Sequence, residues 1–219
     1  MSEALLDNLT NSVARKHGFA IAPGIVTNNL DLLGQGRVQV RIPSRPSFEP
    51  WARITALGAS GSRGFLWIPQ NNDEVLVAFA ENDLSSAYIL GGLWSTLNRP
   101  PLSSPTDFLI KKVLKTGATE SLGHQIEFDD AQQSISIKTS TEQKITLDPK
   151  KIELTNLAGT VTISLDNTSQ SVKITAANKI ELQSLQIELK ATKIDMTAAN
   201  FSITSTGPCS VTGLPIKLN

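Results

Sequence analysis

The sequence predicts an all-β protein with a small barrel in its first half and a strand-rich second half. Residues 19–95 contain short apolar runs separated by turn-forming Gly, Pro, Asn and Asp. From Ile126 onwards, apolar residues recur in pairs with one residue between them, which is the period-two alternation of strands. The β-branched Ile, Val and Thr in these pairs favour the same structure.

Residues 1–18 predict a short amphipathic helix that precedes the barrel. Ser2 is a plausible N-cap, and Leu5, Leu9 and Val13 fall on one helical face. Gly18 would end the helix. The helix could pack on its own domain or dock on a neighbouring subunit.

Residues 19–95 predict a five- or six-stranded barrel, for which the OB-fold is the leading candidate. The expected strands are 20–28, 36–42, 51–57, 65–68, 74–80 and 87–93. OB-folds often bind single-stranded nucleic acid, which requires a basic groove with exposed aromatic side chains. Trp51, Trp67 and Trp94 instead lie in or beside apolar strands, and the formal net charge is zero, so nucleic-acid binding is not predicted.

Residues 96–123 predict a Pro-rich linker, and residues 124–219 predict the second half. From Ile180 the apolar positions Ile180, Ile187, Ile194 and Phe201 are seven residues apart. A coiled coil also has a seven-residue repeat, but it needs apolar partners three and four residues apart between strong helix formers. Here the partner lies two residues on, and the intervening residues are mostly Thr, Ser, Asn and Gln, so strands are favoured.

Repeated short strands of this kind indicate a β-solenoid, in which stacked coils share one core. One copy offers only two or three inward side chains per strand, and Phe201 is the only aromatic residue after Asp129. Three intertwined chains, each supplying one wall of a narrow prism, would solve this problem, although a single-chain solenoid stays open. The predicted residues of the shared core are Ile180, Leu182, Ile187, Leu189, Ile194, Met196, Phe201 and Ile203.

Residues with catalytic or metal-binding chemistry are sparse. His17 and His124 have no Cys or carboxylate at metal-ligand spacing, and Asp129 with Asp130 fits a turn better than an acid pair. Cys209 is the only cysteine, which excludes an internal disulfide. We expect neither an enzyme nor a bound cofactor or metal. No signal peptide or apolar run of 18 residues is visible, so we expect assembly in the cytoplasm.

Several short motifs follow one another through the predicted barrel. They are Ile25-Val26-Thr27-Asn28-Asn29, Gly36-Arg37-Val38-Gln39-Val40-Arg41-Ile42-Pro43, Trp51-Ala52-Arg53-Ile54, Asp73-Glu74-Val75-Leu76-Val77-Ala78-Phe79 and Ile89-Leu90-Gly91-Gly92-Leu93-Trp94. Taken in this order, they resemble the baseplate assembly protein V family. A similar pattern is shared by the central spikes of contractile phage tails and by type VI secretion VgrG proteins. The second half fits the trimeric β-helical needle of this family.

The resemblance implies a homotrimeric spike at the front of a contractile tail or injection machine, which pierces a target cell envelope. It would dock on a hub ring, with Leu5, Leu9 and Val13 as candidate contacts, and belong to a phage tail or tail-like particle. No histidine follows His124, so a metal-binding apex is not expected, and a PAAR-like protein would cap the tip instead. The candidate cap-docking residues are Gly213, Leu214, Pro215, Ile216, Lys217, Leu218 and Asn219. The alternative is a trimeric adhesin or scaffold without a piercing role.

Overall fold

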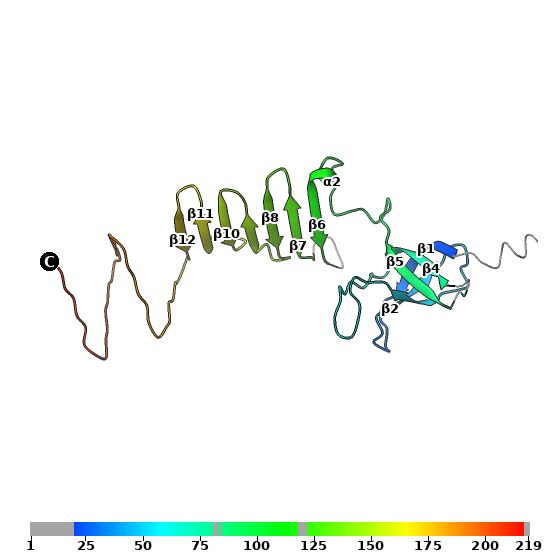
Figure 1. Ribbon diagram of the computed structural model, residues 1–219, viewed down its shortest axis with the longest axis horizontal. Coiled ribbons are helices and arrows are strands. Elements are labelled where there is room, and N and C mark those ends of the chain that lie inside the picture. Colours follow the sequence, from blue (N-terminus) through cyan, green and yellow to red (C-terminus); the bar gives the residue numbers. More distant parts are fainter. Residues whose placement is uncertain (1–19, 81–82, 84, 118–121, 217–219) are drawn as a thin grey trace, which may run out of the picture. The chain divides into compact units, whose positions relative to one another are not determined.

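The computed structural model describes residues 20–80, 83, 85–117 and 122–216, and strands dominate these residues (Figure 1). The barrel, a following sheet and an extended C-terminal segment are each described by themselves. The predicted helix of residues 1–18 lies outside the described residues.

The barrel consists of five strands in the closed order β1-β2-β3-β5-β4. They are β1 (Ala20–Asn28), β2 (Arg37–Arg41), β3 (Trp51–Ile54), β4 (Glu74–Phe79) and β5 (Ala87–Gly92). All neighbours are antiparallel except β3 and β5, which are parallel. Alternate residues of each strand point into the barrel. The side chains at these positions are largely β-branched. The buried core residues are Val26, Val38, Val40, Ile42, Ala52, Val75, Val77, Phe79, Ala87 and Ile89. The predicted OB-like barrel is therefore confirmed.

The predicted strand at residues 65–68 is wrong. Three contiguous apolar residues, Phe65, Leu66 and Trp67, lack the alternation of a half-buried strand, and β1 already pairs with β4 to close the barrel. The segment lies in the loop between β3 and β4 and folds back on it. The N–H of Phe65 donates to the carbonyl of Leu57 at 3.0 Å, and the rings of Phe65 and Trp67 stack 5.8 Å apart.

Seven antiparallel strands follow, and each pairs with its neighbours in sequence. They are β6 (Lys111–Lys115), β7 (Gln125–Asp129), β8 (Ser134–Lys138), β9 (Lys144–Leu147), β10 (Lys151–Thr155), β11 (Thr162–Asp166) and β12 (Ser171–Thr175). The short helix α2 (Asp107–Ile110) leads directly into β6. Residues 96–123 are thus not only a linker, because β6 pairs with β7 at five positions.

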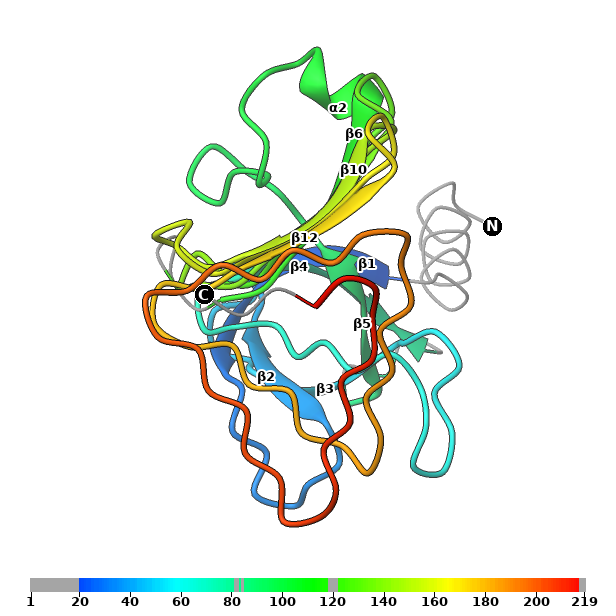
Figure 2. The same ribbon diagram turned by 90° about the vertical axis from the view of Figure 1, so that its left-hand side faces the viewer.

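The interwoven needle predicted for residues 124–219 is not confirmed. Residues 125–175 pair within one chain, since hairpin turns reverse the chain after each strand. Four of these turns contain a residue with left-handed φ, at Gln133, Glu142, Gly159 and Gln170. From Ile180 to Ile216 the chain contains no described strand or helix and winds in wide turns (Figures 1 and 2).

Candidate interaction surface

One face of the seven-stranded sheet is apolar along its whole length. The strand register aligns one apolar residue from each of the seven strands into a first row. A further apolar residue from each of β7–β12 forms a second row. The first row is Leu114, Ile126, Ile137, Ile145, Leu154, Ile163 and Ile174. The second row is Phe128, Ile135, Leu147, Ile152, Leu165 and Val172. We call the two rows together the apolar face.

Most side chains of the apolar face are exposed in the single chain. Leu154 is 42% exposed, Phe128 44% and Val172 68%. The described residues therefore do not cover this face. A contiguous exposed apolar surface of this kind marks a place where another protein surface packs.

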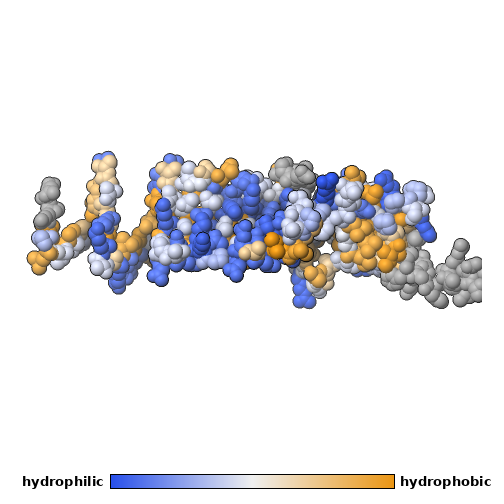
Figure 3. Space-filling view, turned by 90° about the horizontal axis from the view of Figure 1, so that it is seen from above, coloured by the Kyte–Doolittle hydropathy of each residue, from blue (hydrophilic) through white to orange (hydrophobic). Residues whose placement is uncertain are grey.

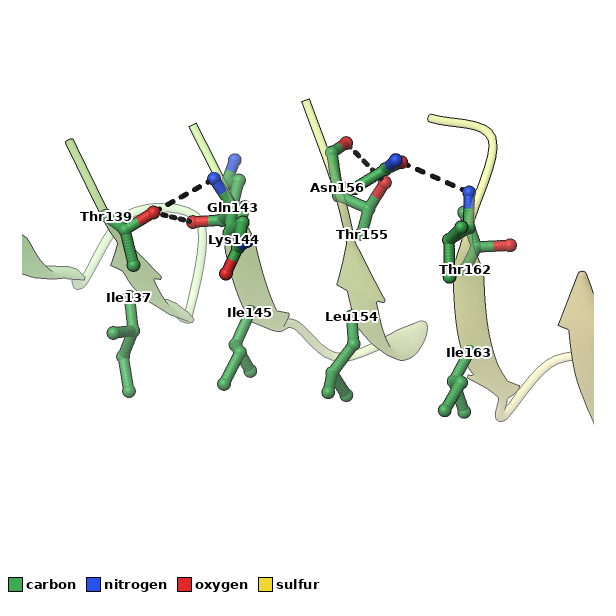
Figure 4. Close-up of a pocket in the computed structure, with 11 residues that line it drawn as sticks. Ile137, Thr139, Gln143, Lys144, Ile145, Leu154, Thr155, Asn156, Thr162 and Ile163 are labelled. Atoms are coloured by element: carbon green, nitrogen blue, oxygen red, sulfur yellow. Dashed lines mark hydrogen bonds between the residues drawn. The ribbon is translucent and has the colours of Figure 1, made fainter. Parts of the chain in front are cut away.

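The centre of the apolar face forms an open hollow of about 340 Å³. Figure 4 shows Ile137, Ile145, Leu154 and Ile163, from four neighbouring strands, pointing in the same direction. The polar groups at its rim are occupied by turn hydrogen bonds, such as the N–H of Gln143 donating to Oγ1 of Thr139 at 3.1 Å. The hollow thus offers packing surface rather than reactive groups.

The opposite face of the sheet is polar and carries ion pairs. Nζ of Lys111 lies 3.6 Å from carboxylate oxygens of both Glu127 and Asp129, and Nζ of Lys151 lies 2.9 Å from Glu153. The charge of Glu127 raises the pKa of Lys111, and the hydrogen bond that Lys151 donates to Glu153 raises the pKa of Lys151. The side of the sheet seen in Figure 3 is largely hydrophilic. Of the two faces, the apolar face is therefore the one suited to packing against another surface.

Carboxylates fix the turns between the strands. Asp148 accepts hydrogen bonds from the N–H groups of Lys150 and Lys151, and Asp166 accepts from those of Thr168 and Ser169. These backbone donors stabilise the charged form and lower the pKa of both aspartates. Asp129 accepts from the N–H of Gln132 at 2.9 Å, in agreement with the predicted turn. The turns hold the strands in the register that aligns the rows.

The C-terminal segment continues the two-faced pattern without a strand partner in the described chain. Nζ of Lys190 lies 2.8 Å from Glu188, and Nζ of Lys193 lies 2.7 Å from Asp195. In an extended chain, residues two apart lie on the same side. The two charged residues of each ion pair therefore share one side, and the apolar residues that alternate with them lie on the other. The predicted core residues are 51–70% exposed here, and they are Ile180, Leu182, Ile187, Leu189, Ile194, Met196, Phe201 and Ile203. The single chain thus does not bring them together.

The sequence predicted alternating apolar pairs from Ile126 onwards, but the named core candidates began only at Ile180. The apolar pairs of β7–β12 follow the same alternation and could have been named as well. For β6 the signal was weak, since only Leu114 of this strand belongs to the apolar face.

The remaining candidate docking residues lie at the two ends of the chain. Leu5, Leu9 and Val13 are outside the described residues, as are Lys217, Leu218 and Asn219. Of the described tip residues, Leu214 is fully exposed and Ile216 is half-exposed.

In the barrel, Asp31 and Arg37 organise the loop between β1 and β2. The carboxylate of Asp31 accepts from Nε and Nη2 of Arg37 at 3.1 and 3.0 Å, and from the N–H groups of Leu33, Gln35 and Arg37. The hydrogen bonds from Arg37 hold the pKa of Asp31 well below its usual range. The guanidinium of Arg37 also lies 5.5 Å from the ring centroid of Trp51. Arg37 is therefore engaged within the barrel.

Within the described ranges, no cluster of three or more His, Cys, Asp or Glu side chains could hold a metal ion. None of the described helices is long and apolar enough to cross a membrane.

Comparison with known proteins defines the class of the barrel. Residues 22–94 match the family described as the Type VI secretion system/phage-baseplate injector OB domain. This segment covers β2, β3, β4 and β5 completely, and it covers β1 from the third residue of that strand onwards. The resemblance to baseplate and VgrG spike proteins that the sequence predicted is confirmed.

Individual relatives agree with the family match. The chain is 25% identical over 107 residues to the Type VI secretion system spike proteins VgrG2a and VgrG2b of Pseudomonas aeruginosa, a stretch covering 46% of this chain. It is 28% identical over 102 residues, 43% of this chain, to the actin cross-linking toxin VgrG1 of Vibrio cholerae serotype O1. The matched stretch covers only 13%, 10% and 9% of the length of these three relatives. The likeness is therefore to a VgrG-like baseplate spike, and not to the whole of any one relative.

Proposed function

We propose that this protein is the central spike of a contractile tail or injection machine, and that three copies form its shaft. The apolar face carries this proposal, because it runs the length of the sheet, is open in one chain, and follows a barrel of the injector OB family. The role is mechanical and requires no enzymatic chemistry. The relatives named as spike proteins support the same role.

The dimensions of the sheet favour three copies. A strand of five residues is roughly 16 Å long at about 3.3 Å per residue. An equilateral prism with walls of that width places each wall roughly 5 Å from the axis, which is half the usual spacing of about 10 Å between packed sheets. Two walls would leave the sides open. Four walls would stand roughly 8 Å from the axis and leave a void along it. Three walls fill the axis with the two apolar rows of each copy.

The length of this shaft follows from the strand count. Seven strands spaced about 4.8 Å apart extend the prism by roughly 30 Å between the first and last strand. The domain plan we propose is an N-terminal helix at residues 1–18, the barrel at 19–95, and a shaft that includes the sheet and residues 176–219.

The mass of the purified protein tests the trimer. Light scattering should give three times 23.5 kDa at micromolar concentration, with no change on dilution. A stable folded monomer under these conditions would refute the proposal.

We also propose two docking partners, both of which rest on the spike role. A hub ring would bind the N-terminal segment through Leu5, Leu9 and Val13, so deleting residues 1–16 should abolish hub capture while the trimer persists. A PAAR-like cap would bind residues 213–219, so removing residues 216–219 should abolish cap binding and weaken delivery. Retained hub or cap binding by the matching truncation would move that docking surface elsewhere. The particle would be assembled in the cytoplasm and act on a target cell envelope.

A further inference from the structure

The outside of the barrel has one charged side and one apolar side. Strands β2 and β3 turn arginine side chains outward, at Arg37, Arg41 and Arg53. Strands β1, β4 and β5 are neighbours in the barrel, and Glu74 is the only charged residue in their sequences. We call the larger apolar residues that these three strands turn outward the barrel patch. They are Ile21, Pro23, Ile25, Leu76, Tyr88 and Leu90.

The described residues leave much of the barrel patch open. Ile21 is 55% exposed and Leu90 is 47% exposed. The strand register makes the patch contiguous, because Pro23 lies beside Leu76 across β1 and β4, and Tyr88 continues the patch onto β5. A contiguous apolar surface on the outside of a small barrel marks a place where another element packs.

The segment directly before β1 has an apolar stripe that suits this patch. Residues 1–19 lie outside the described residues, and the sequence predicts an amphipathic helix there that ends at Gly18. At about 100° per residue, Leu5, Leu9 and Val13 fall within an arc of about 80° on this helix. The stripe is therefore about as narrow as one contact face of a helix.

The spacing of the stripe matches the spacing of the outward residues of β1. Four helical residues advance about 6 Å, and two strand residues advance about 6.6 Å. A helix that folds back along β1 therefore places Val13, Leu9 and Leu5 in turn over the three patch residues of that strand. The patch is three strands wide, or roughly 10 Å between its outer strands, which is about the diameter of one helix.

The connection is long enough for this reversal. The chain enters β1 at Ala20, one residue before the patch begins at Ile21. The four residues from Lys16 to Ala20 reach up to roughly 13 Å, which exceeds the distance of about 10 Å between packed layers. Gly18 lies within this stretch, and glycine adopts the backbone conformations that a sharp reversal requires.

Other occupants of the barrel patch are less favoured. A patch that packs against the same patch of a second copy makes an isologous contact, which joins two copies and does not extend to three. A separate protein would compete with a segment that is tethered to the patch through a few residues, and such tethering gives an effective concentration in the millimolar range. The chain's own N-terminal segment therefore has the advantage.

We infer that residues 2–16 form a helix that folds back on the barrel patch of the same copy. This inference concerns a single chain and does not depend on the proposed spike role. It bears on the proposed hub docking, because Leu5, Leu9 and Val13 cannot contact the hub and the barrel at the same time. Hub docking through these residues would require the helix to leave the barrel patch first.

Disulfide trapping on the full chain tests this inference. All variants carry Cys209→Ser, so that the introduced cysteines are the only ones. The test pair is Leu5→Cys with Ile25→Cys. The matched control is Asp7→Cys with Ile25→Cys, because Asp7 lies on the opposite side of the predicted helix. Under mild oxidation, we expect the test pair to form a disulfide within one chain about tenfold or more faster than the control pair.

Non-reducing electrophoresis separates disulfides within a chain from disulfides between chains, and tryptophan fluorescence checks that the barrel of each variant is folded. A second pair, Leu9→Cys with Leu76→Cys, carries the test if Ile25→Cys disturbs β1. Leu76 lies on β4, beside the residue of β1 over which Leu9 is expected.

The possible outcomes separate this inference from the proposed function. Disulfides between chains would place the helix on the barrel of another copy and overturn packing within one copy. Equal trapping rates for the test and control pairs would show that the stripe does not face the barrel patch, and would overturn the inference as well. A purified monomer that traps the disulfide within one chain would refute the trimeric spike and support the inference.

Discussion

Substitution of Leu154 tests directly whether the apolar face is an interface between copies. Leu154 lies in the middle of the first row and is 42% exposed in the single chain. Burial of a whole leucine side chain stabilises by about 1.5–3 kcal/mol, so covering the exposed part contributes about 0.6–1.3 kcal/mol per copy. Three copies together give about 2–4 kcal/mol, and Leu154→Ala should therefore weaken the trimer by roughly 30- to 700-fold in its dissociation constant.

Leu154→Asp should weaken the trimer further, because three unpaired carboxylates would be buried around one axis at several kcal/mol each. Thr155→Asp is the matched control. It adds the same group at the next residue of β10, on the opposite face and across from Lys144, and Figure 4 shows the two side chains on different sides of the strand. Sedimentation over a dilution series measures both. Equal weakening by Leu154→Asp and Thr155→Asp would refute the assignment of the packing face.

Two further predictions concern the barrel, whose unfolding can be followed by tryptophan fluorescence because all three tryptophans lie between residues 51 and 94. Asp31→Asn should lower the free energy of unfolding of the barrel at neutral pH. Because folding lowers the pKa of Asp31, the difference in unfolding free energy from the unmodified protein should be constant down to about pH 5 and shrink below about pH 4. A difference that does not depend on pH would show that the charge of Asp31 is not what stabilises the loop. Gly64→Ala should destabilise the barrel by about 1–3 kcal/mol, because Gly64 has a φ of +132° and a Cβ there would lie 2.9 Å from Cα of Ala59. Gly61→Ala, where a Cβ meets nothing within 4 Å, should have little effect, and equal losses in the two variants would refute the steric argument.

Alternation predicted strands well where one face is covered or apolar, and poorly elsewhere. The prediction of residues 20–28 coincides with β1, and the alternating apolar residues from Ile126 to Ile174 fall in β7–β12, except Val161, which lies just before β11. The prediction failed for residues 65–68, where contiguous apolar residues form a loop, and for β6, where Lys112 occupies the place of an apolar residue in the second row. Local pattern reports which side of a strand is apolar. It does not report whether a short apolar run has a partner strand.

The choice between pairing within a chain and pairing between chains could not be predicted from alternation either. Backbone hydrogen bonds are the same in both cases. Residues 151–155 of β10 and residues 179–183, which lie outside any described strand, differ in sequence only at the last residue. Several turns between the paired strands contain a left-handed residue, whereas none of the described residues after Gln170 has a positive φ. Gln133, Glu142 and Gln170 adopt left-handed φ without being glycine, so the sequence gives little warning of these turns. The regular seven-residue spacing drew the named core candidates to the segment from Ile180 onwards, which has no hairpin among its described residues, and not to the apolar pairs of β7–β12.

The direction of the hydrogen bonds bears on the proposed mechanical role. In β6–β12 the strands follow one another along the sheet, so the backbone hydrogen bonds run from strand to strand, along the length of the proposed shaft. An axial load on such a shaft falls on continuous ladders of backbone bonds in three walls, with close-packed apolar rows between them.

The ion pairs Lys111–Glu127 and Lys151–Glu153 lie on the outer face, where solvent screens them and they contribute little to stability. Axial stiffness should therefore depend on the apolar face and not on the charged one. High salt should leave the unfolding force of the shaft almost unchanged in single-molecule pulling, while Leu154→Ala should lower it. A strong decrease with salt alone would contradict this assignment of the load.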